Sequence, residues 1–295
     1  MPAFSHKRRN RATLAHSGAA PAARAAQAKE QPMSSEPSIQ QVIDRILATT
    51  PFQPGVDTVD TVKIGDASQP IRGIATTFLA TCEVIEQAAA SGANLLIAHE
   101  PLFYNHLDET DWLANDPVYA AKRALIEQHG MVIWRFHDFW HTRRPDGIYV
   151  GVLRALGWQS DADAPFLCTL PPTTLADLAA QLKQRLGVDT VRMAGDADLL
   201  VRRVGLLVGS PGGRVHINVL GRDDVDALVC GEIAEWETCE YVRDATRLGM
   251  KKGLIVVGHE PSEEAGMAYL AEWLRENVPG VPAAHIPSGN PLWYA

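Results

Sequence analysis

Apolar residues follow two spacings that alternate along the chain. Residues 39–47 place their apolar side chains at helical intervals behind Ser38, a residue type that caps helix N-termini. Residues 94–98 and 131–136 are short, almost continuously apolar runs, which are typical of buried strands. Gly92 and Gly130 follow helical runs and suit their C-terminal ends. The pattern therefore predicts strands and helices in turn.

The same alternation extends over the rest of the body of the chain. The predicted strands are residues 60–66, 71–80, 94–98, 131–136, 201–209, 227–231 and 253–257, and the predicted helices are 39–47, 81–93, 117–130, 147–158, 173–187, 235–249 and 262–277. Residues 214–219 alternate apolar and polar positions, which predicts that His216 lies on a strand face. A connection as long as residues 81–93 requires a parallel strand pair. The sequence predicts an α/β fold with mixed, largely parallel sheets.

Residues 166–174 interrupt the pattern with two prolines and no periodicity. We place a boundary there, between an N-terminal α/β half, 38–165, and a C-terminal α/β half, 166–295. Residues 1–37 are rich in Ala, Arg, Ser and Pro, with no acidic residue before Glu30, and we expect them to be disordered. Either residues 1–32 are a transit peptide for organellar import, or Met33 is the true start and the protein is cytoplasmic.

Composition and charge narrow the class of protein. The 295 residues are 46% hydrophobic and 21% charged, as in ordinary soluble globular proteins. A formal net charge of -8 argues against a protein that coats nucleic acid or an anionic membrane. No apolar run approaches the roughly 20 residues that cross a bilayer. The four cysteines form no CxxC pair, which favours reduced thiols.

Candidate chemistry gathers where three predicted strands end. The polar side chains that follow these strands are His99 and Glu100, then His137, Asp138 and His141, then His259 and Glu263. The carboxyl ends of parallel strands line one crevice, so these groups meet if the three strands are neighbours in one sheet.

The spacing within two of these endings suits a shared cation. Pro261 favours a helix entry, which would place His259 in the loop and Glu263 in the first turn, where both could reach one ion. His137 and His141 converge if the chain turns directly after its strand. Six or seven imidazole and carboxylate groups exceed the needs of one tetrahedral ion and suit two adjacent divalent ions. The absence of thiolates favours Zn, Mn, Fe or Co.

Each residue also has a plain structural interpretation. A single histidine at the end of a buried strand is more often hydrogen-bonded than metal-bound. Glu264 in a first helical turn could simply complement the helix dipole, which is the interpretation we prefer for it. Three similar strand endings, with few histidines elsewhere, favour the metal site.

Essentially all of residues 38–295 resembles the NIF-three-like family, also labelled type 2 GTP cyclohydrolase I homologue or dinuclear metal centre protein. The segments that resemble it are 64–103, 136–157, 172–212 and 228–264, and the most specific is the His-x-x-x-Glu of His259 and Glu263. The resemblance implies two α/β halves around a pair of metal ions, within a ring-shaped homohexamer. By position it implies His99, His137, His259 and Glu263 as ligands.

Two positions depart from the family pattern in a complementary way. This chain has Glu100 where the family typically has a second histidine, and His141 where it typically has aspartate. We interpret the pair as an exchanged ligand set that keeps the charge about constant, with Asp138 as an alternative to His141. Glu232 matches an acidic family position near the site.

The leading hypothesis is a metal-dependent hydrolase with two divalent ions, Zn, Mn or Fe, that acts on a nucleotide or related small molecule. Glu100 and Glu263 are the candidates for moving a proton. The alternative is a non-catalytic metal-binding scaffold that works through protein partners. A third interpretation is that the histidines and glutamates are structural and bind no metal.

Overall fold

The computed structural model describes residues 36–51, 53 and 55–293. The expectations of disorder, a transit peptide or a start at Met33 concern residues outside this range, apart from residues 36 and 37. The first described helix, α1 (Ile39–Leu47), begins as predicted at Ser38. The Ser38 side chain accepts a hydrogen bond from the Gln41 backbone N–H, and the Gln41 side chain accepts one from the Ser38 backbone N–H.

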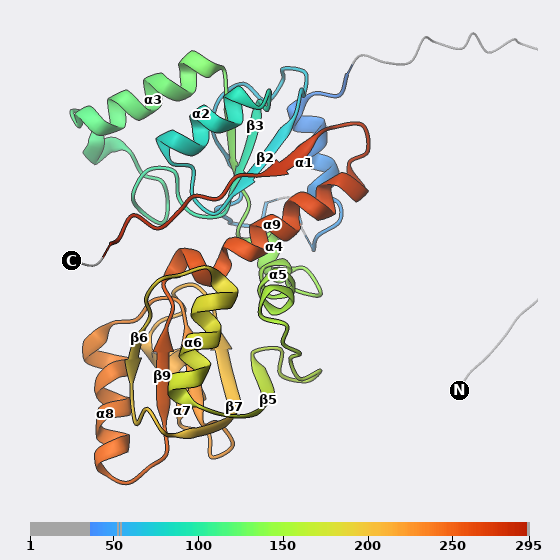
Figure 1. Ribbon diagram of the computed structural model, residues 1–295. Helices are drawn as coiled ribbons and strands as arrows, with labels where there is room; N and C mark the ends of the chain where they lie inside the picture. Colours follow the sequence, from blue (N-terminus) through green and yellow to red (C-terminus); the bar gives the residue numbers. More distant parts are fainter. Residues whose placement is uncertain (1–35, 52, 54, 294–295) are drawn as a thin grey trace, which may run out of the picture. The chain divides into compact units, whose positions relative to one another are not determined.

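The strands form two mixed sheets, which confirms the predicted α/β class (Figure 1). The first has the order β1-β4-β3-β2-β10 and consists of β1 (Val62–Ile64), β4 (Val132–Arg135), β3 (Leu95–Ala98), β2 (Ile74–Thr77) and β10 (Ala283–His285). The second has the order β5-β7-β8-β9-β6 and consists of β5 (Leu167–Thr174), β7 (Leu200–Leu207), β8 (Ala227–Cys230), β9 (Gly253–Val256) and β6 (Arg192–Ala194). In each sheet the central strands are parallel, and β1, β5 and β6 pair antiparallel at the edges.

The other helices connect and cover these strands. They are α2 (Cys82–Ala90), α3 (Pro117–His129), α4 (Asp138–Thr142), α5 (Gly147–Leu156), α6 (Leu175–Leu186), α7 (Gly213–Leu220), α8 (Glu240–Arg247) and α9 (His259–Asn277), with a 3-10 turn at Asp111–Leu113 and a π-helical turn at Glu235–Cys239. None of the described helices is both long and apolar enough to cross a bilayer.

Two sequence interpretations are corrected here. Residues 167–174 form β5 despite their prolines, because β5 lies at a sheet edge where a missing N–H is tolerated. His216 lies on α7 and not on a strand. Its buried Nδ1 is 3.1 Å from Thr238 Oγ1, so tertiary packing overrides the short alternating pattern.

Register brings the predicted strand endings to common sheet edges. Ala98 pairs with Thr77 on one side and with Arg135 on the other, so His99 and the residues after β4 leave the sheet together. In the second sheet Cys230 pairs with Val256. The condition that all three strands are neighbours in one sheet is not met, because β9 belongs to the second sheet.

Helix α9 links the two sheets, because it follows β9 and leads to β10 beside β2 (Figure 1). It crosses α5 at close range through two glycines. A side chain at Gly151 would lie 2.2 Å from the Ala265 carbonyl oxygen, and one at Gly266 would lie 2.5 Å from Ile148 Cα. Larger residues would separate the helices, and α9 carries two of the predicted site residues.

The aromatic residues of the segment FHDFW secure α4 against α9. Phe136 and Trp140 are fully buried, and Trp140 packs on Tyr269 and Trp273 with ring centroids 5.8 and 5.9 Å apart. Burying a side chain of this size stabilises the fold by about 2–3 kcal/mol. The apolar half of the segment therefore positions its polar half, which includes His137.

Candidate metal centre

All six predicted site residues meet where the two sheets approach each other. His99 and Glu100 follow β3, His137 precedes α4, His141 lies in its last turn, and His259 and Glu263 lie one turn apart on α9. The sequence pattern predicted that His259 lies in the loop before the helix, but His259 is the first residue of α9. It follows Gly258, whose φ of 103° strongly favours glycine.

Glu263 lies at the centre of the cluster and is almost fully buried. Its Oε2 is 3.6 Å from His99 Nε2 and 3.2 Å from His259 Nε2. Its Oε1 is 3.8 Å from His141 Nε2. One carboxylate thus faces three imidazoles from three different elements.

Glu100 forms the opposite side of the cluster. Its Oε1 is 3.4 Å from His259 Nε2 and 3.8 Å from His137 Nε2. Ligand atoms lie within 4.8 Å of one another in two groups, His99 with His137 and His141, and His99 with Glu100 and Glu263. Groups of this composition can hold a divalent metal ion.

Two of the imidazoles are oriented by carboxylates on their outer side. His137 Nδ1 is 2.9 Å from Asp138 Oδ1, and His141 Nδ1 is 3.0 Å from Asp146 Oδ2. A proton on each Nδ1 satisfies these contacts and leaves each Nε2 with a free lone pair toward the cluster. This is how metal-binding histidines are usually oriented.

The other two imidazoles have the same orientation. His99 Nδ1 is 3.4 Å from the Phe136 carbonyl oxygen, which can only accept a hydrogen bond. His259 Nδ1 is 3.5 Å from Glu232 Oε1. Four imidazoles therefore turn Nδ1 outward and Nε2 inward.

Unpaired buried atoms show that the cluster fits a cation. His99 Nε2 and Glu263 Oε2 are buried without a hydrogen-bond partner in the described structure, although they face each other at 3.6 Å. With the proton on His99 Nδ1 both atoms are acceptors, and burying unpaired acceptors is costly. A cation between them would satisfy both.

The protonation of the cluster follows the same logic. Burial would lower the pKa of His259, but Glu100 and Glu263 outweigh it and raise that pKa to about 10. Burial lowers the pKa of His99 well below its ordinary value, and nearby His141 and His137 lower it further. The two carboxylates that favour a proton on His259 would equally favour a divalent ion, so the proton and the ion would compete for this position.

Arg135 was missed in the sequence, where it stands inside an apolar strand. The side chain is 1% exposed, and its Nη2 lies 3.5 Å from Glu100 Oε2. Its Nε donates to the His99 carbonyl oxygen at 3.1 Å. Burial opposes ionisation of Glu100, but His259, His137 and Arg135 together lower its pKa. A charged residue in a buried strand was the available signal.

Asp60 and Asp146 were also missed. Asp60 is buried and accepts hydrogen bonds from the backbone N–H groups of His137, Asp138 and Phe139 at 2.7, 2.9 and 2.8 Å. It thereby fixes the start of α4. Asp146 caps α5 and also contacts His141. Neither lies at the end of a predicted strand, so the strand-end pattern could not reveal them.

Asp138, the alternative to His141, does not face the centre of the cluster. Its Oδ1 contacts His137, and its Oδ2 accepts from Thr58 Oγ1 at 2.7 Å and from the Val59 backbone at 3.2 Å. The structure thus gives Asp138 an orienting contact, whereas His141 points Nε2 at Glu263.

Glu264 does more than complement the helix dipole, which corrects the preferred sequence interpretation. It pairs with His285 Nε2 at 2.9 Å and accepts hydrogen bonds from the backbone and hydroxyl of Ser288. Glu264 therefore connects α9 to the segment that contains His285 and Ser288.

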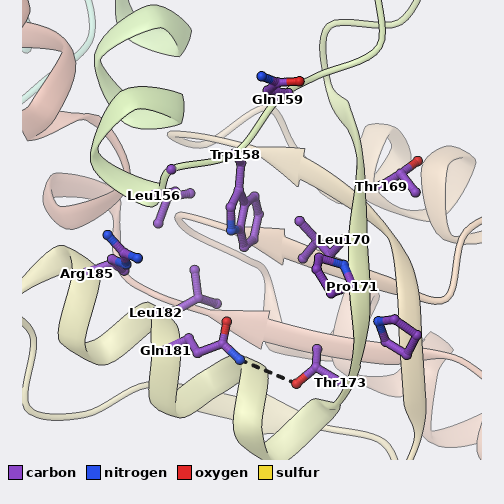
Figure 2. A pocket seen from close by; sticks show the side chains of 12 residues that line it. Leu156, Trp158, Gln159, Thr169, Leu170, Pro171, Thr173, Gln181, Leu182 and Arg185 are labelled. Carbon is purple, nitrogen blue, oxygen red and sulfur yellow. Dashed lines mark hydrogen bonds between the residues drawn. The ribbon is translucent and has the colours of Figure 1, made fainter.

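A pocket of about 780 Å³ adjoins the cluster, and Glu100 and His259 are among its lining residues. A second pocket, of about 470 Å³, lies among α5, β5 and α6, where Trp158 faces Leu156, Leu170 and Leu182 (Figure 2). The second pocket is lined by no carboxylate, imidazole or thiol. Of these two pockets, the first is the one that brings space for a ligand to the metal-binding groups.

Residues 38–291 match the sequence profile of the Duf34/NIF3 family, NGG1p interacting factor 3. The chain belongs to the Duf34/NIF3 family. This match covers both sheets and every residue of the cluster, and it confirms the resemblance inferred from the sequence.

Curated relatives are similar over most of their length. The GTP cyclohydrolase 1 type 2 homolog of Clostridium perfringens is 22% identical over 244 residues, which are 79% of this chain and 88% of that protein. The homolog of the same name in Vibrio cholerae is 26% identical over 231 residues, 75% of this chain and 86% of its own.

Solved structures confirm the fold. A Bacillus cereus protein related to NIF3 superposes with a TM-score of 0.71 at 17% identity, covering 89% of this chain and all of its own. The Staphylococcus aureus hypothetical protein SA1388 gives a TM-score of 0.70 at 18% identity, covering 88% of this chain and all of its own. At this identity the likeness concerns the fold alone.

Proposed function

We propose that this protein is a metal-dependent hydrolase that holds two divalent ions, Zn, Mn or Fe, and acts on a nucleotide or related small molecule. The observation that carries the proposal is the common orientation of four imidazoles. Each places Nδ1 against an acceptor and Nε2 toward Glu100, Glu263 or both. Six ligand groups exceed the needs of one tetrahedral ion, and Glu263 turns Oε2 toward His259 and Oε1 toward His141, so its carboxylate could serve two adjacent ions.

Divalent ions held there would supply Lewis acidity and make a water molecule acidic enough to react near neutral pH. The chain's own residues would do the rest. His99, His137, His141 and His259 would hold the ions through Nε2. Glu100, whose lowered pKa keeps it ionised near neutral pH, can accept a proton at the side of the cluster that lines the pocket. Glu263, at the buried centre, is the second candidate for this role.

The pocket supports a small-molecule substrate. Its volume of about 780 Å³ lies within the usual range for ligand sites, roughly 300–1,000 Å³. Arg192 lines it with a half-exposed guanidinium that also pairs with Glu235, and it could meet an anionic group. The curated relatives carry the name of a cyclohydrolase homolog, which is consistent with hydrolysis of a nucleotide.

The test is to measure metal by elemental analysis and then hydrolysis of a nucleotide panel, before and after chelation and reloading. We expect metal-dependent turnover that His259→Ala abolishes together with metal binding. Glu86→Ala, an exposed glutamate on α2, is the control and should keep both. Metal-loaded protein without turnover on any substrate would favour the scaffold alternative. Protein that binds no metal would refute both.

We also propose assembly into the homohexamer that the family resemblance implies. Several large apolar side chains of the described chain are exposed and available for contacts between copies, among them Trp112, Leu248 and Met250. Light scattering should give about six times the chain mass of 32.1 kDa. A monomer at micromolar concentration would contradict this part.

A further inference from the structure

Tyr104 occupies a backbone conformation that a bulky residue rarely adopts. Its φ is 66°, in the left-handed region, and its side chain is 55% exposed on the wall of the pocket beside the metal centre. Such conformations cost about 1–3 kcal/mol and persist only where surrounding contacts enforce them. The exposed ring gains little from core packing, so its position needs another explanation.

The loop around Tyr104 is built to hold this conformation. Asn105 Nδ2 donates to the carbonyl oxygens of Phe103 and Glu109 at 3.1 and 2.7 Å. Asp108, also at positive φ, accepts a hydrogen bond from the Phe103 backbone at 2.9 Å. Hydrogen bonds within the loop therefore fix the backbone both before and after Tyr104.

A buried ammonium group supports the ring. Lys122 is 5% exposed, its Nζ donates to the Leu102 carbonyl oxygen at 2.8 Å, and it lies 5.5 Å from the centroid of Tyr104. The attraction between an ammonium and an aromatic face strengthens when the ammonium is removed from water. Lys122 thus favours the observed orientation of Tyr104.

A second exposed aromatic residue lines the same pocket. Trp293 is 80% exposed and follows the segment that Glu264 holds through Ser288 at 3.0 and 2.9 Å. Glu264 lies on α9, five residues after His259. The helix that contributes to the metal centre therefore also anchors the segment carrying Trp293.

We propose that Tyr104 and Trp293 bind a planar ring of the substrate and so present its polar part to Glu100 and His259. The substrate class is a small molecule with an aromatic or heteroaromatic ring and an adjoining hydrolysable polar group. This inference rests on the proposed function for the reaction, but the ring-binding role is measurable without turnover.

The experiment compares two probes on the metal-loaded full-length chain by calorimetric titration. Adenosine 5′-monophosphate carries a planar base, and ribose 5-phosphate lacks it. Wild type should bind the nucleotide at least about tenfold more tightly, since stacking on an aromatic residue contributes about 1–3 kcal/mol per base. Tyr104→Ala and Trp293→Ala should each remove most of that difference and leave ribose 5-phosphate affinity unchanged. Tyr104→Phe should retain it.

Trp236→Ala is the matched control, because Trp236 is similarly exposed, at 77%, but does not line the pocket. It should bind both probes like wild type. Trp293 is 80% exposed, so Trp293→Ala should fold and tests the inference even if Tyr104→Ala fails to fold.

Equal affinities for the two probes in wild type would overturn the inference, as would no nucleotide binding at millimolar concentration. Unchanged nucleotide affinity in Tyr104→Ala and Trp293→Ala would also overturn it. A changed oligomeric mass in these variants would assign the residues to assembly instead. Selective binding of the ring without hydrolysis would support the ring-binding role and contradict the proposed reaction. Hydrolysis with equal binding of the two probes would support the reaction and contradict the ring-binding role.

Discussion

The buried guanidinium of Arg135 forms an ion pair with one oxygen of Glu100, while the other oxygen faces the metal-binding cluster. Arg135 Nη2 lies 3.5 Å from Glu100 Oε2, while Glu100 Oε1 lies 3.4 Å from His259 Nε2. The same guanidinium donates to the backbone carbonyl of His99. One buried cation therefore positions the two residues that follow β3.

Arg135→Met should weaken metal binding about 10- to 100-fold, the usual effect of losing a residue that orients a ligand. It should also destabilise the fold by about 3–5 kcal/mol, because Glu100 loses its buried partner. Metal titration and urea unfolding check both effects. Arg154→Met removes an exposed ion pair with Glu272. It should change neither the free energy of metal binding nor the free energy of unfolding by more than about 0.5 kcal/mol. Equal effects from the two variants would contradict the assignment.

Asp146→Asn should lower metal affinity about 10- to 100-fold with little loss of stability. Burial lowers the pKa of His141, but Asp146, with smaller contributions from Glu263 and Glu100, outweighs burial and raises that pKa. An asparagine can still cap α5 but holds the imidazole less strongly. Asp116→Asn changes the equivalent cap of α3, away from the cluster, and should bind metal normally. Unchanged metal titration in Asp146→Asn would count against an orienting role.

Asp60→Ala should destabilise the protein by about 1–3 kcal/mol, because three N–H groups at the start of α4 lose their acceptor. Displacement of His137 and His141 should reduce metal content as well. The comparison is Asp66→Ala, which removes an exposed carboxylate that accepts hydrogen bonds from the backbone N–H and the hydroxyl of Ser68. Urea unfolding and elemental analysis should show a clear difference between the two variants. Wild-type metal content in Asp60→Ala would refute the positioning role.

Lys122 should make stability rise with pH above about 8. Burial lowers its pKa from 10.5 to about 8, so between these values the unfolded chain binds the extra proton. The full free energy of unfolding is present above pH 10.5, where Lys122 is neutral in both states. It decreases as the pH falls through 8, by about 3 kcal/mol at most, because the buried amine must then take up a proton. The difference in unfolding free energy between wild type and Lys122→Met should increase across this range. Exposed Lys251→Met should follow wild type, and a flat difference curve for Lys122→Met would refute the prediction.

Glu100→His should shift metal preference toward Zn. A carboxylate oxygen favours Mn or Fe more than an imidazole does, so the native residue makes its side of the cluster harder. Competition between Zn and Mn, read by elemental analysis, measures the shift. Glu86→His on the surface of α2 controls for adventitious binding by the new imidazole. An identical Zn preference in wild type and Glu100→His would contradict the expected role of Glu100.

Local patterns were enough to find the elements that carry the cluster. The apolar runs before His99 and His137 form β3 and β4 as predicted, because a short buried strand requires continuous apolar residues on both faces. The capping sequence at Ser38 also acted as expected. Residues 214–219 were misread because a short alternating stretch on a buried helix resembles a strand.

The sequence by itself determined that histidines and carboxylates follow three buried strands and that the chain is an α/β protein. Only the tertiary structure decided that β9 lies in a different sheet from β3 and β4, and that His259 still meets His99 through Glu263. It also selected Arg135, Asp60 and Asp146 as the supporting residues. Their partners lie far along the chain or across packed elements, and a hydrogen bond to a buried group depends on distance in space, which residue spacing along a strand does not encode.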